Sequence, residues 1–214
     1  MKQPSRFALI GGGGLGLEVA GYIHDTLQDH LESLSLWDDN PPTPEPALPL
    51  LSYRGQINDI KASADEAVLI CIGDTQLRTR IAQQLERKRI KLGRFIHPSA
   101  IISSQAILAD GCIILPFSCV SYGAMIGSNT LINSHVGIGH HATVQAHSVI
   151  SPHSLIAGHT TIGEGVFIGS GAVITPGKTI GRHTKITAGS VIYRNAPENS
   201  FLSGNPAKNL CRGS

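Results

Sequence analysis

A six-residue period runs through the C-terminal half of the chain. From Ile102 to Ile192, every sixth residue is isoleucine, leucine or valine, with no insertion. The residue two places earlier is usually small, with Lys178 as the one large exception, and a glycine often follows. This period fits neither an α-helix nor an alternating strand, but it fits the hexapeptide repeat of a parallel β-helix. We therefore expect short strands that each bury one aliphatic side chain inside a prism. The small residues and the glycines should let the chain turn its corners.

The first third of the chain has a different pattern. Short apolar runs predict strands at Phe7–Ile10, Leu34–Trp37 and Val68–Ile72. Apolar residues at every fourth position predict a helix after the first strand and another after the third. These helix positions are Val19, Ile23, Leu27, Leu77, Ile81 and Leu85. The alternation of strand and helix favours a parallel sheet with helices packed on it, in a Rossmann-like β-α-β-α-β unit.

A glycine-rich loop follows the first predicted strand. Gly11, Gly13 and Gly16 fit the G-x-G-x-x-G pattern in the required context between a strand and a helix, and Asp38 lies 22 residues beyond Gly16. Bare backbone amides at a helix N-terminus bind a diphosphate, and the acidic residue suits a ribose hydroxyl. A tight turn with close strand–helix packing and no ligand is the alternative. Since the region holds one half of a dinucleotide fold, a mononucleotide diphosphate fits it better than NAD.

Composition excludes several classes of protein. The 17 Lys and Arg residues nearly balance the 15 Asp and Glu residues, which argues against a general nucleic-acid binder. No apolar stretch approaches the roughly 18 residues of a membrane span. The four cysteines form no C-x-x-C pair, so a structural zinc site is not expected, and reduced thiols fit a cytoplasmic protein. They are Cys71, Cys112, Cys119 and Cys211.

Both halves together resemble the bacterial sugar acyltransferases with hexapeptide repeats. This family includes the bacillosamine-pathway UDP-amino-sugar N-acetyltransferase and the sialic acid O-acetyltransferases. The resemblance rests on four stretches: Leu9–Gly16 with Glu18, Ile72–Asp74 with Arg78, Ile96–Ala100, and Gly204–Lys208. It implies a left-handed β-helix with three hexapeptides per coil, so residues 18 apart should stack about 4.8 Å apart. It also implies a homotrimer with acetyl-CoA in the seams between neighbouring β-helices.

The resemblance divides the chain into three parts. Residues 1–96 are expected to bind a nucleotide sugar, residues 97–195 to form the acyltransferase β-helix, and residues 196–214 to close the CoA site as a tail. The substrate-binding residues that it implies are Gly11, Gly13, Gly14, Gly16, Asp38, Asp39, Gly73 and Asp74. The residues implied for acetyl-CoA are Gly158, Ala188, Gly189, Pro206 and Lys208.

The family's catalytic histidine falls on His140, two residues past the core position Ile138. The next residue is His141 in this chain, where the family usually has an acid that orients the imidazole. Another acid could serve, or His141 could orient His140 through a neutral hydrogen bond, or the activity could differ. Gly158 lies 18 residues beyond His140, and its counterpart in the family donates a backbone N–H to the thioester oxygen.

Histidines also recur at six-residue spacing, three places past a core position, at His135, His141, His147, His153 and His159. The simplest interpretation is a polar corner position that tolerates histidine. For the whole chain we expect an acetyl-CoA-dependent N-acetyltransferase acting on a nucleotide-linked amino sugar, without a metal. A sugar O-acetyltransferase is the near alternative. A non-catalytic nucleotide-sugar sensor and a zinc enzyme like the γ-class carbonic anhydrases are the more distant ones.

Overall fold

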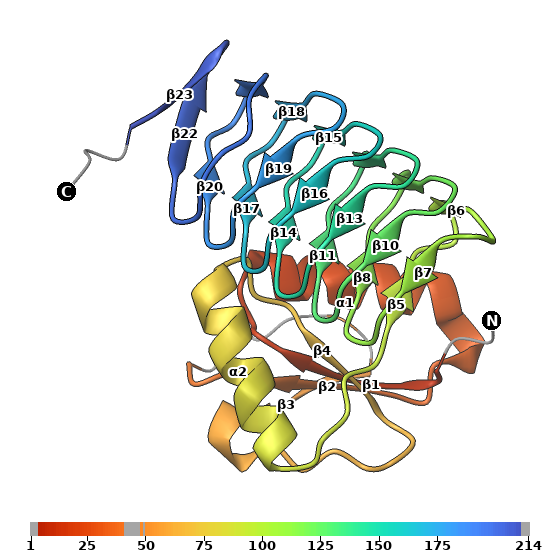
Figure 1. Ribbon diagram of the computed structural model, residues 1–214. Helices are drawn as coiled ribbons and strands as arrows, with labels where there is room; N and C mark the ends of the chain where they lie inside the picture. Colours follow the sequence, from red (N-terminus) through yellow and green to blue (C-terminus); the bar gives the residue numbers. More distant parts are fainter. Residues whose placement is uncertain (1–3, 41–47, 49, 211–214) are drawn as a thin grey trace.

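A four-stranded parallel sheet forms the N-terminal part of the computed structural model, which describes residues 4–40, 48 and 50–210 (Figure 1). Cys211 and the rest of the predicted tail beyond Leu210 lie outside these residues. The strands lie in the order β3-β2-β1-β4, and each neighbouring pair is parallel. The strands are β1 (Arg6–Ile10), β2 (Ser33–Trp37), β3 (Leu51–Gly55) and β4 (Ala67–Ile70). The helices are α1 (Gly14–Leu27), α2 (Thr75–Arg87) and the short 3-10 turns η1 (Gln28–His30) and η2 (Ile57–Asp59).

The sheet contains one strand more than the sequence predicts. The sequence does not predict β3 because its residues, LSYRG, form no continuous apolar run. Their burial in the structure does not alternate regularly either. The only helical residues described between β2 and β4 are those of η2. The chain therefore runs β-α-β-β-β-α, and its next strand, β5 (Phe95–Ile96), pairs with the second part of the molecule.

The remainder of the chain is the predicted left-handed parallel β-helix. Its two-residue strands stack in three sheets, and partners are 18 residues apart, as in Met125 with Thr143. The five-stranded face consists of β7 (Ile107–Leu108), β10 (Met125–Ile126), β13 (Thr143–Val144), β16 (Thr161–Ile162) and β19 (Thr179–Ile180). The six-stranded face consists of β6 (Ile101–Ile102), β9 (Cys119–Val120), β12 (Gly137–Ile138), β15 (Leu155–Ile156), β18 (Val173–Ile174) and β21 (Val191–Ile192). The eight-stranded face consists of β5, β8 (Ile113–Ile114), β11 (Leu131–Ile132), β14 (Val149–Ile150), β17 (Phe167–Ile168), β20 (Lys185–Ile186), β22 (Phe201–Gly204) and β23 (Ala207–Asn209).

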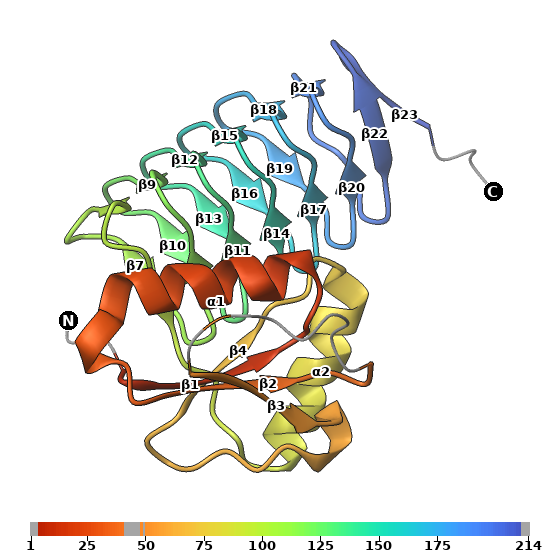
Figure 2. The ribbon, with the colours of Figure 1, turned by 180° about the vertical axis from the view of Figure 1, so that it is seen from behind.

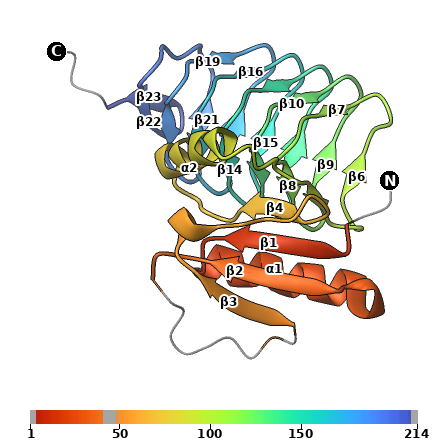
Figure 3. The ribbon, with the colours of Figure 1, turned by 90° about the horizontal axis from the view of Figure 1, so that it is seen from below.

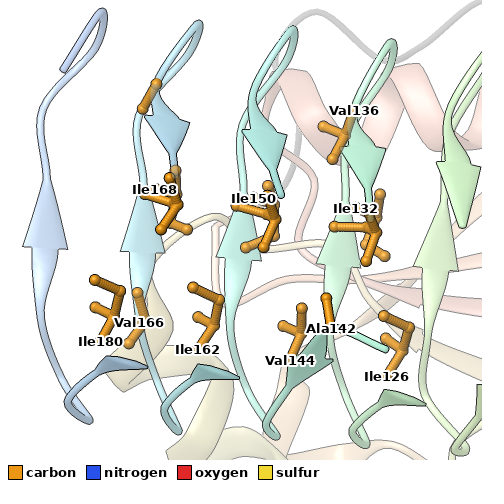
Figure 4. Close-up of a cluster of buried hydrophobic side chains, with 14 of the residues drawn as sticks. Ile126, Ile132, Val136, Ala142, Val144, Ile150, Ile162, Val166, Ile168 and Ile180 are labelled. Carbon is orange, nitrogen blue, oxygen red and sulfur yellow. The ribbon is translucent and has the colours of Figure 1, made fainter. Parts of the chain in front are cut away.

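The predicted aliphatic positions form the core of the prism. From Ile114 to Ile192 every one of them is buried, and Figure 4 shows them stacked from rung to rung. Each fully buried isoleucine or valine side chain stabilises the fold by about 1.5–3 kcal/mol. Buried hydroxyl groups two residues before some of these aliphatic positions link successive coils by hydrogen bonds. For example, Ser148 Oγ donates to the Gly163 carbonyl and accepts from the Val166 N–H. Small residues are needed there because the side chain points into the narrow corner of the prism.

The corners turn by a repeated four-residue turn, illustrated by Gly139 to Ala142. The Ala142 N–H donates to the Gly139 carbonyl, and the third residue, His141, has φ 56°. A positive φ at the third residue is typical of type II turns. Glycine at the first residue has another cause than the expected freedom to turn. A Cβ atom on Gly139 would lie 2.5 Å from the Gly158 backbone nitrogen of the next rung.

The N-terminal part packs on the eight-stranded face through α1. Val19, Ala20 and Ile23 of this helix share one buried cluster with Ile113, Leu131 and Val149. Figure 2 shows α1 lying between the sheet and the β-helix and crossing successive rungs. The other helix, α2, covers the opposite face of the sheet, where Ile81 and Leu85 contact Ile10 and Ile70 (Figure 3). This arrangement leaves the six-stranded and five-stranded faces uncovered by the described residues of the N-terminal part.

Candidate active site

Three histidines and a glycine meet at the corner between the six-stranded and five-stranded faces. We call His140, His141, Gly158 and His159 the histidine corner. His140 Nδ1 lies 3.3 Å from His141 Nδ1, and all three imidazoles are exposed. The His141 and His159 rings are stacked with their centroids 5.0 Å apart and their planes 3° apart. The His140 ring stands nearly perpendicular to the His159 ring.

The backbone of the corner explains why histidine occurs there. His141 and His159 both have φ values near +57°, in the left-handed region, and His135, His147, His153 and His183 share this conformation. Other corners have glycine or asparagine at the same place, for example Asn129 and Gly165, and one corner has Phe117. Glycine adopts this conformation freely, and among other residues asparagine, aspartate and histidine are enriched there. The polar corner position expected from the sequence is therefore a backbone requirement.

Gly158 lies directly above the His140 ring, as the 18-residue spacing predicts. A Cβ atom on Gly158 would be 2.7 Å from His140 Nε2, so only glycine leaves this ring in place. The Gly158 N–H has no hydrogen-bond partner among the described residues. It occupies the second position of the turn, where Pro152 and Pro176, which lack an N–H, occur on other rungs. The corner thus combines a free imidazole nitrogen with an available backbone donor.

The contact between His140 and His141 fits one of the three interpretations of the missing acid. If His140 Nδ1 carries the proton and donates it to His141 Nδ1, then His140 Nε2 keeps its lone pair and faces Gly158. A neutral imidazole orients its neighbour through such a hydrogen bond, although it does not contribute the charge of a carboxylate.

The glycine loop has the geometry of a backbone-lined site. Gly11 has φ +106°, and a Cβ atom on Gly16 would collide with the Gly11 carbonyl oxygen. These two glycines are required by the packing of strand against helix. Gly13 and Gly14 have nothing within 4 Å of an added Cβ atom, and Gly13 caps α1 without a side-chain hydrogen bond. The start of α1 therefore has open space beside these two glycines, as an anion site at a helix N-terminus requires.

The acids expected beside this loop hold its backbone. Asp38 Oδ2 accepts from the Gly12 N–H at 2.6 Å, and Asp39 Oδ1 accepts from the Ile57 N–H at 3.0 Å. Asp74 caps α2 by accepting from the Leu77 N–H at 2.8 Å. The neighbouring Gly73 has nothing within 4 Å of an added Cβ atom. All of these residues except Gly73 thus have a structural contribution besides any binding role.

The structure does not bring all the predicted site residues together in one chain. The glycine loop belongs to the part that packs on the eight-stranded face, whereas the histidine corner lies between the other two faces. The residues predicted to bind acetyl-CoA are also separated from one another. Gly158 lies at the histidine corner, whereas Ala188 and Gly189 lie at the corner that follows β20. Pro206 and Lys208 line a hollow of about 480 Å³ at the end of the β-helix.

A buried polar network that sequence reasoning did not assign joins the two parts of the molecule. Arg78 of α2 is fully buried, and its guanidinium donates to the carbonyls of Ile70, Ile72 and Asn129 and to Asn129 Oδ1. Asn129 Nδ2 lies 3.0 Å from His147 Nδ1. Burial lowers the pKa of Arg78 to about 10 and also lowers the pKa of His147. A signal was present, because Arg78 shares the spacing of the apolar positions Ile81 and Leu85.

Comparison with known proteins agrees with this architecture. Residues 159–194 match the family model described as bacterial transferase hexapeptide (six repeats). This chain carries the hexapeptide repeat of bacterial transferases. A search of curated protein sequences gave no match. Among the described residues, neither α1 nor α2 has the length and apolar character needed to cross a membrane.

Solved structures match nearly the whole of the repeat-bearing chain. The acetyltransferase domain of PglB from Neisseria gonorrhoeae, solved with acetyl coenzyme A, is 26% identical, with a TM-score of 0.88 over 97% of this chain and 100% of that one. Perosamine N-acetyltransferase from Caulobacter crescentus, a histidine-to-asparagine variant solved with CoA and GDP-perosamine, is 27% identical, with a TM-score of 0.85 over 98% and 97%. WeeI from Acinetobacter baumannii, at 22% identity and a TM-score of 0.82 over 96% and 99%, supports the fold. The predicted resemblance to hexapeptide sugar acyltransferases is confirmed.

Proposed function

We propose that this protein is an acetyl-CoA-dependent N-acetyltransferase that acts on a nucleotide-linked amino sugar. The observation that carries the proposal is the likeness, over 97–98% of this chain, to two solved acetyltransferases, one with acetyl coenzyme A and one with CoA and GDP-perosamine. The likeness includes both the part with the glycine loop and the part with the histidine corner. An amine acceptor is favoured over a hydroxyl because the perosamine enzyme is an N-acetyltransferase.

The proposed reaction is direct transfer with His140 as general base. The amino nitrogen attacks the thioester carbonyl, and His140 Nε2 accepts the proton that the nitrogen loses. The Gly158 N–H would stabilise the oxyanion of the tetrahedral intermediate. As the intermediate collapses, the C–S bond breaks and the thiolate of CoA takes a proton from His140. General base catalysis of this kind contributes about 10²–10⁴-fold to a rate.

His141 would act as a positioning residue in this scheme. Its Nδ1 atom, 3.3 Å from His140 Nδ1, would accept a hydrogen bond from the N–H at His140 Nδ1. This hydrogen bond would keep the lone pair of His140 on Nε2. An amine is a better nucleophile than a hydroxyl, so a base with a neutral partner suits N-acetylation. Both rings stay within reach of solvent and of an incoming substrate because they lie on an exposed corner.

A homotrimer would complete the site. The glycine loop and the histidine corner lie on different sides of one chain, so a neighbouring chain must supply one of them. The six-stranded face offers an apolar surface for such a neighbour: Ile101 and Leu155 point outward from it and are 70% and 46% exposed. Acetyl-CoA would lie in the seam, against Gly158 of one chain and residues such as Gly189 and Lys208 of another. The nucleotide diphosphate would bind at Gly13, Gly14 and Gly73.

The test is acetyl transfer to a panel of UDP-, GDP- and dTDP-linked amino sugars, with the release of the CoA thiol as the measured signal. The wild-type protein should consume acetyl-CoA with at least one member, whereas His140→Ala should lose about 10²–10⁴-fold in kcat while CoA binding is retained. Asn129 shows that asparagine fits a left-handed corner of this β-helix, so His153→Asn is a matched control that should keep its activity. Near-normal turnover by His140→Ala would overturn the base assignment. Transfer only to sugar hydroxyls would make the protein an O-acetyltransferase instead.

A further inference from the structure

The histidine corner has the donor atoms of a transition-metal site. His140, His141 and His159 each offer a ring nitrogen, and these atoms lie within 4.8 Å of one another. No other such cluster of histidine, cysteine or carboxylate groups occurs among the residues that the structure describes. Imidazole nitrogen is a preferred ligand of zinc, copper and nickel. Three histidines with an open fourth position form the ligand set of zinc sites that retain an exchangeable ligand.

One distance already fits a bound ion. Zinc–nitrogen bonds of about 2.0–2.1 Å at the tetrahedral angle place two ligand atoms about 3.3 Å apart. His140 Nδ1 and His141 Nδ1 are 3.3 Å apart. His159 stands one rung further along, stacked on His141 and edge-on to His140, and one of its ring nitrogens lies within 4.8 Å of a ring nitrogen of each.

The third histidine separates this corner from the other histidines of the β-helix. His135 and His153 are also exposed and stacked, with centroids 4.7 Å apart, yet their neighbour on the previous rung is Phe117. Their corner therefore has two potential ligands, whereas the histidine corner has three. His140 makes the difference, because the residue that precedes His135 in the equivalent turn is Ser134.

We propose that His140, His141 and His159 bind one zinc ion per chain and that the ion inhibits the enzyme. The binding itself is independent of the proposed function, whereas the inhibition rests on it. A metal held at His140 Nδ1 places the proton of the neutral ring on Nε2, because a neutral imidazole has one lone-pair nitrogen. Nε2 then cannot accept the proton of the amine. Inhibition would leave the binding of acetyl-CoA intact, since the ion occupies the other edge of the ring.

Two variants of the full chain test the site. Asparagine fits the left-handed corner, as Asn129 shows, so His159→Asn removes a ligand without a backbone change. His153→Asn makes the same change one corner earlier, at φ 60° against 58° for His159. The metal-free proteins are titrated with zinc in competition with a chromophoric chelator, and Co²⁺ replaces zinc for a visible spectrum.

The wild-type protein and His153→Asn should bind one ion per chain and give the strong visible bands of tetrahedral Co²⁺. His159→Asn should bind at least about 10-fold more weakly and lose those bands. Equal binding by all three proteins, or equal weakening in both variants, would overturn the site. The rate of each protein is then measured with and without zinc, relative to its own metal-free rate. Tight binding without inhibition would refute the second half of the proposal, and a chain that binds zinc but transfers no acetyl group would refute the proposed function alone.

Discussion

The Nε2 atom of His140 and the α-carbon of Gly158 face each other across one rung, so closely that a methyl group on Gly158 would be 2.7 Å from the ring. Gly158→Ala should therefore displace the His140 ring without altering the core. A displacement of about 1 Å costs about 10²-fold in rate. We expect that loss in kcat, measured as thiol release from acetyl-CoA.

The matched control for this substitution is Gly177→Asn, on the next rung of the same corner. Gly177 has φ +69° and nothing within 4 Å of an added Cβ atom. Asparagine accepts this conformation, so the control should turn over as the wild type does. Unchanged activity in Gly158→Ala would show that the position of the His140 ring does not matter for the reaction.

Mixing two inactive variants tests whether a site spans two chains. Gly13→Asp places a carboxylate at the N-cap of α1, where it favours the helix but repels a diphosphate. His140→Ala removes the base. Random assembly of equal amounts into trimers would pair an intact loop with an intact histidine at about one site in four. Recovery of about a quarter of the wild-type rate is expected, and no recovery would place the whole site within one chain.

The buried guanidinium should be essential for stability. Arg78→Met keeps the bulk of the side chain but leaves the carbonyl oxygens of Ile72 and Asn129 without their donor. Each unsatisfied buried acceptor costs about 1–3 kcal/mol, so the free energy of unfolding should fall by about 2–5 kcal/mol. Arg80→Met, on the exposed side of α2, should change it by less than about 0.5 kcal/mol. Denaturant titration of both variants decides this, and similar values would contradict the assigned contacts.

Two half-buried histidines, His147 of this network and His97 next to β5, predict a dependence of stability on pH. Burial lowers the pKa of His147, and it also lowers the pKa of His97. Since these groups bind protons more weakly in the folded chain than in the unfolded chain, the folded state is favoured above about pH 6.5 and loses stability as the pH falls through that value. His147→Asn removes one of them. The free energy of unfolding of this variant should fall less steeply between about pH 7 and 5 than that of the wild type. An equally steep fall would exclude His147 as a contributor.

The sequence predicts the β-helix well because its signal repeats. Each hexapeptide independently specifies one buried aliphatic residue, so a single exception such as Lys178 does not obscure the period. The stacking of Gly158 on His140 follows from the 18-residue coil alone. The sequence predicts the N-terminal sheet less completely, since β3 is a short edge strand whose residues show no regular burial pattern.

The hexapeptide period does not predict which residues join the N-terminal sheet and helices to the β-helix. The outward residues Ile113, Leu131 and Val149 are apolar because α1 covers them, but each also follows the pattern of an ordinary strand. The Arg78–Asn129 contact joins residues 51 positions apart and depends on how two folded parts meet. The clustering of His159 with His140 was obscured for a different reason, because histidine recurs at so many corners that none of them stands out.

The turn residues with left-handed backbone conformation allow the β-helix to exchange side chains at its corners without a change of fold. Because glycine, asparagine and histidine satisfy the same backbone requirement, a reactive ring can be added or removed at a corner by one codon change while the coil stays as it is. A new pair of rings one rung apart is brought to within contact distance by the coil itself. In a chain of this kind, catalytic groups and metal ligands can move along the axis in steps of one rung, and the scaffold does not have to be rebuilt to follow them.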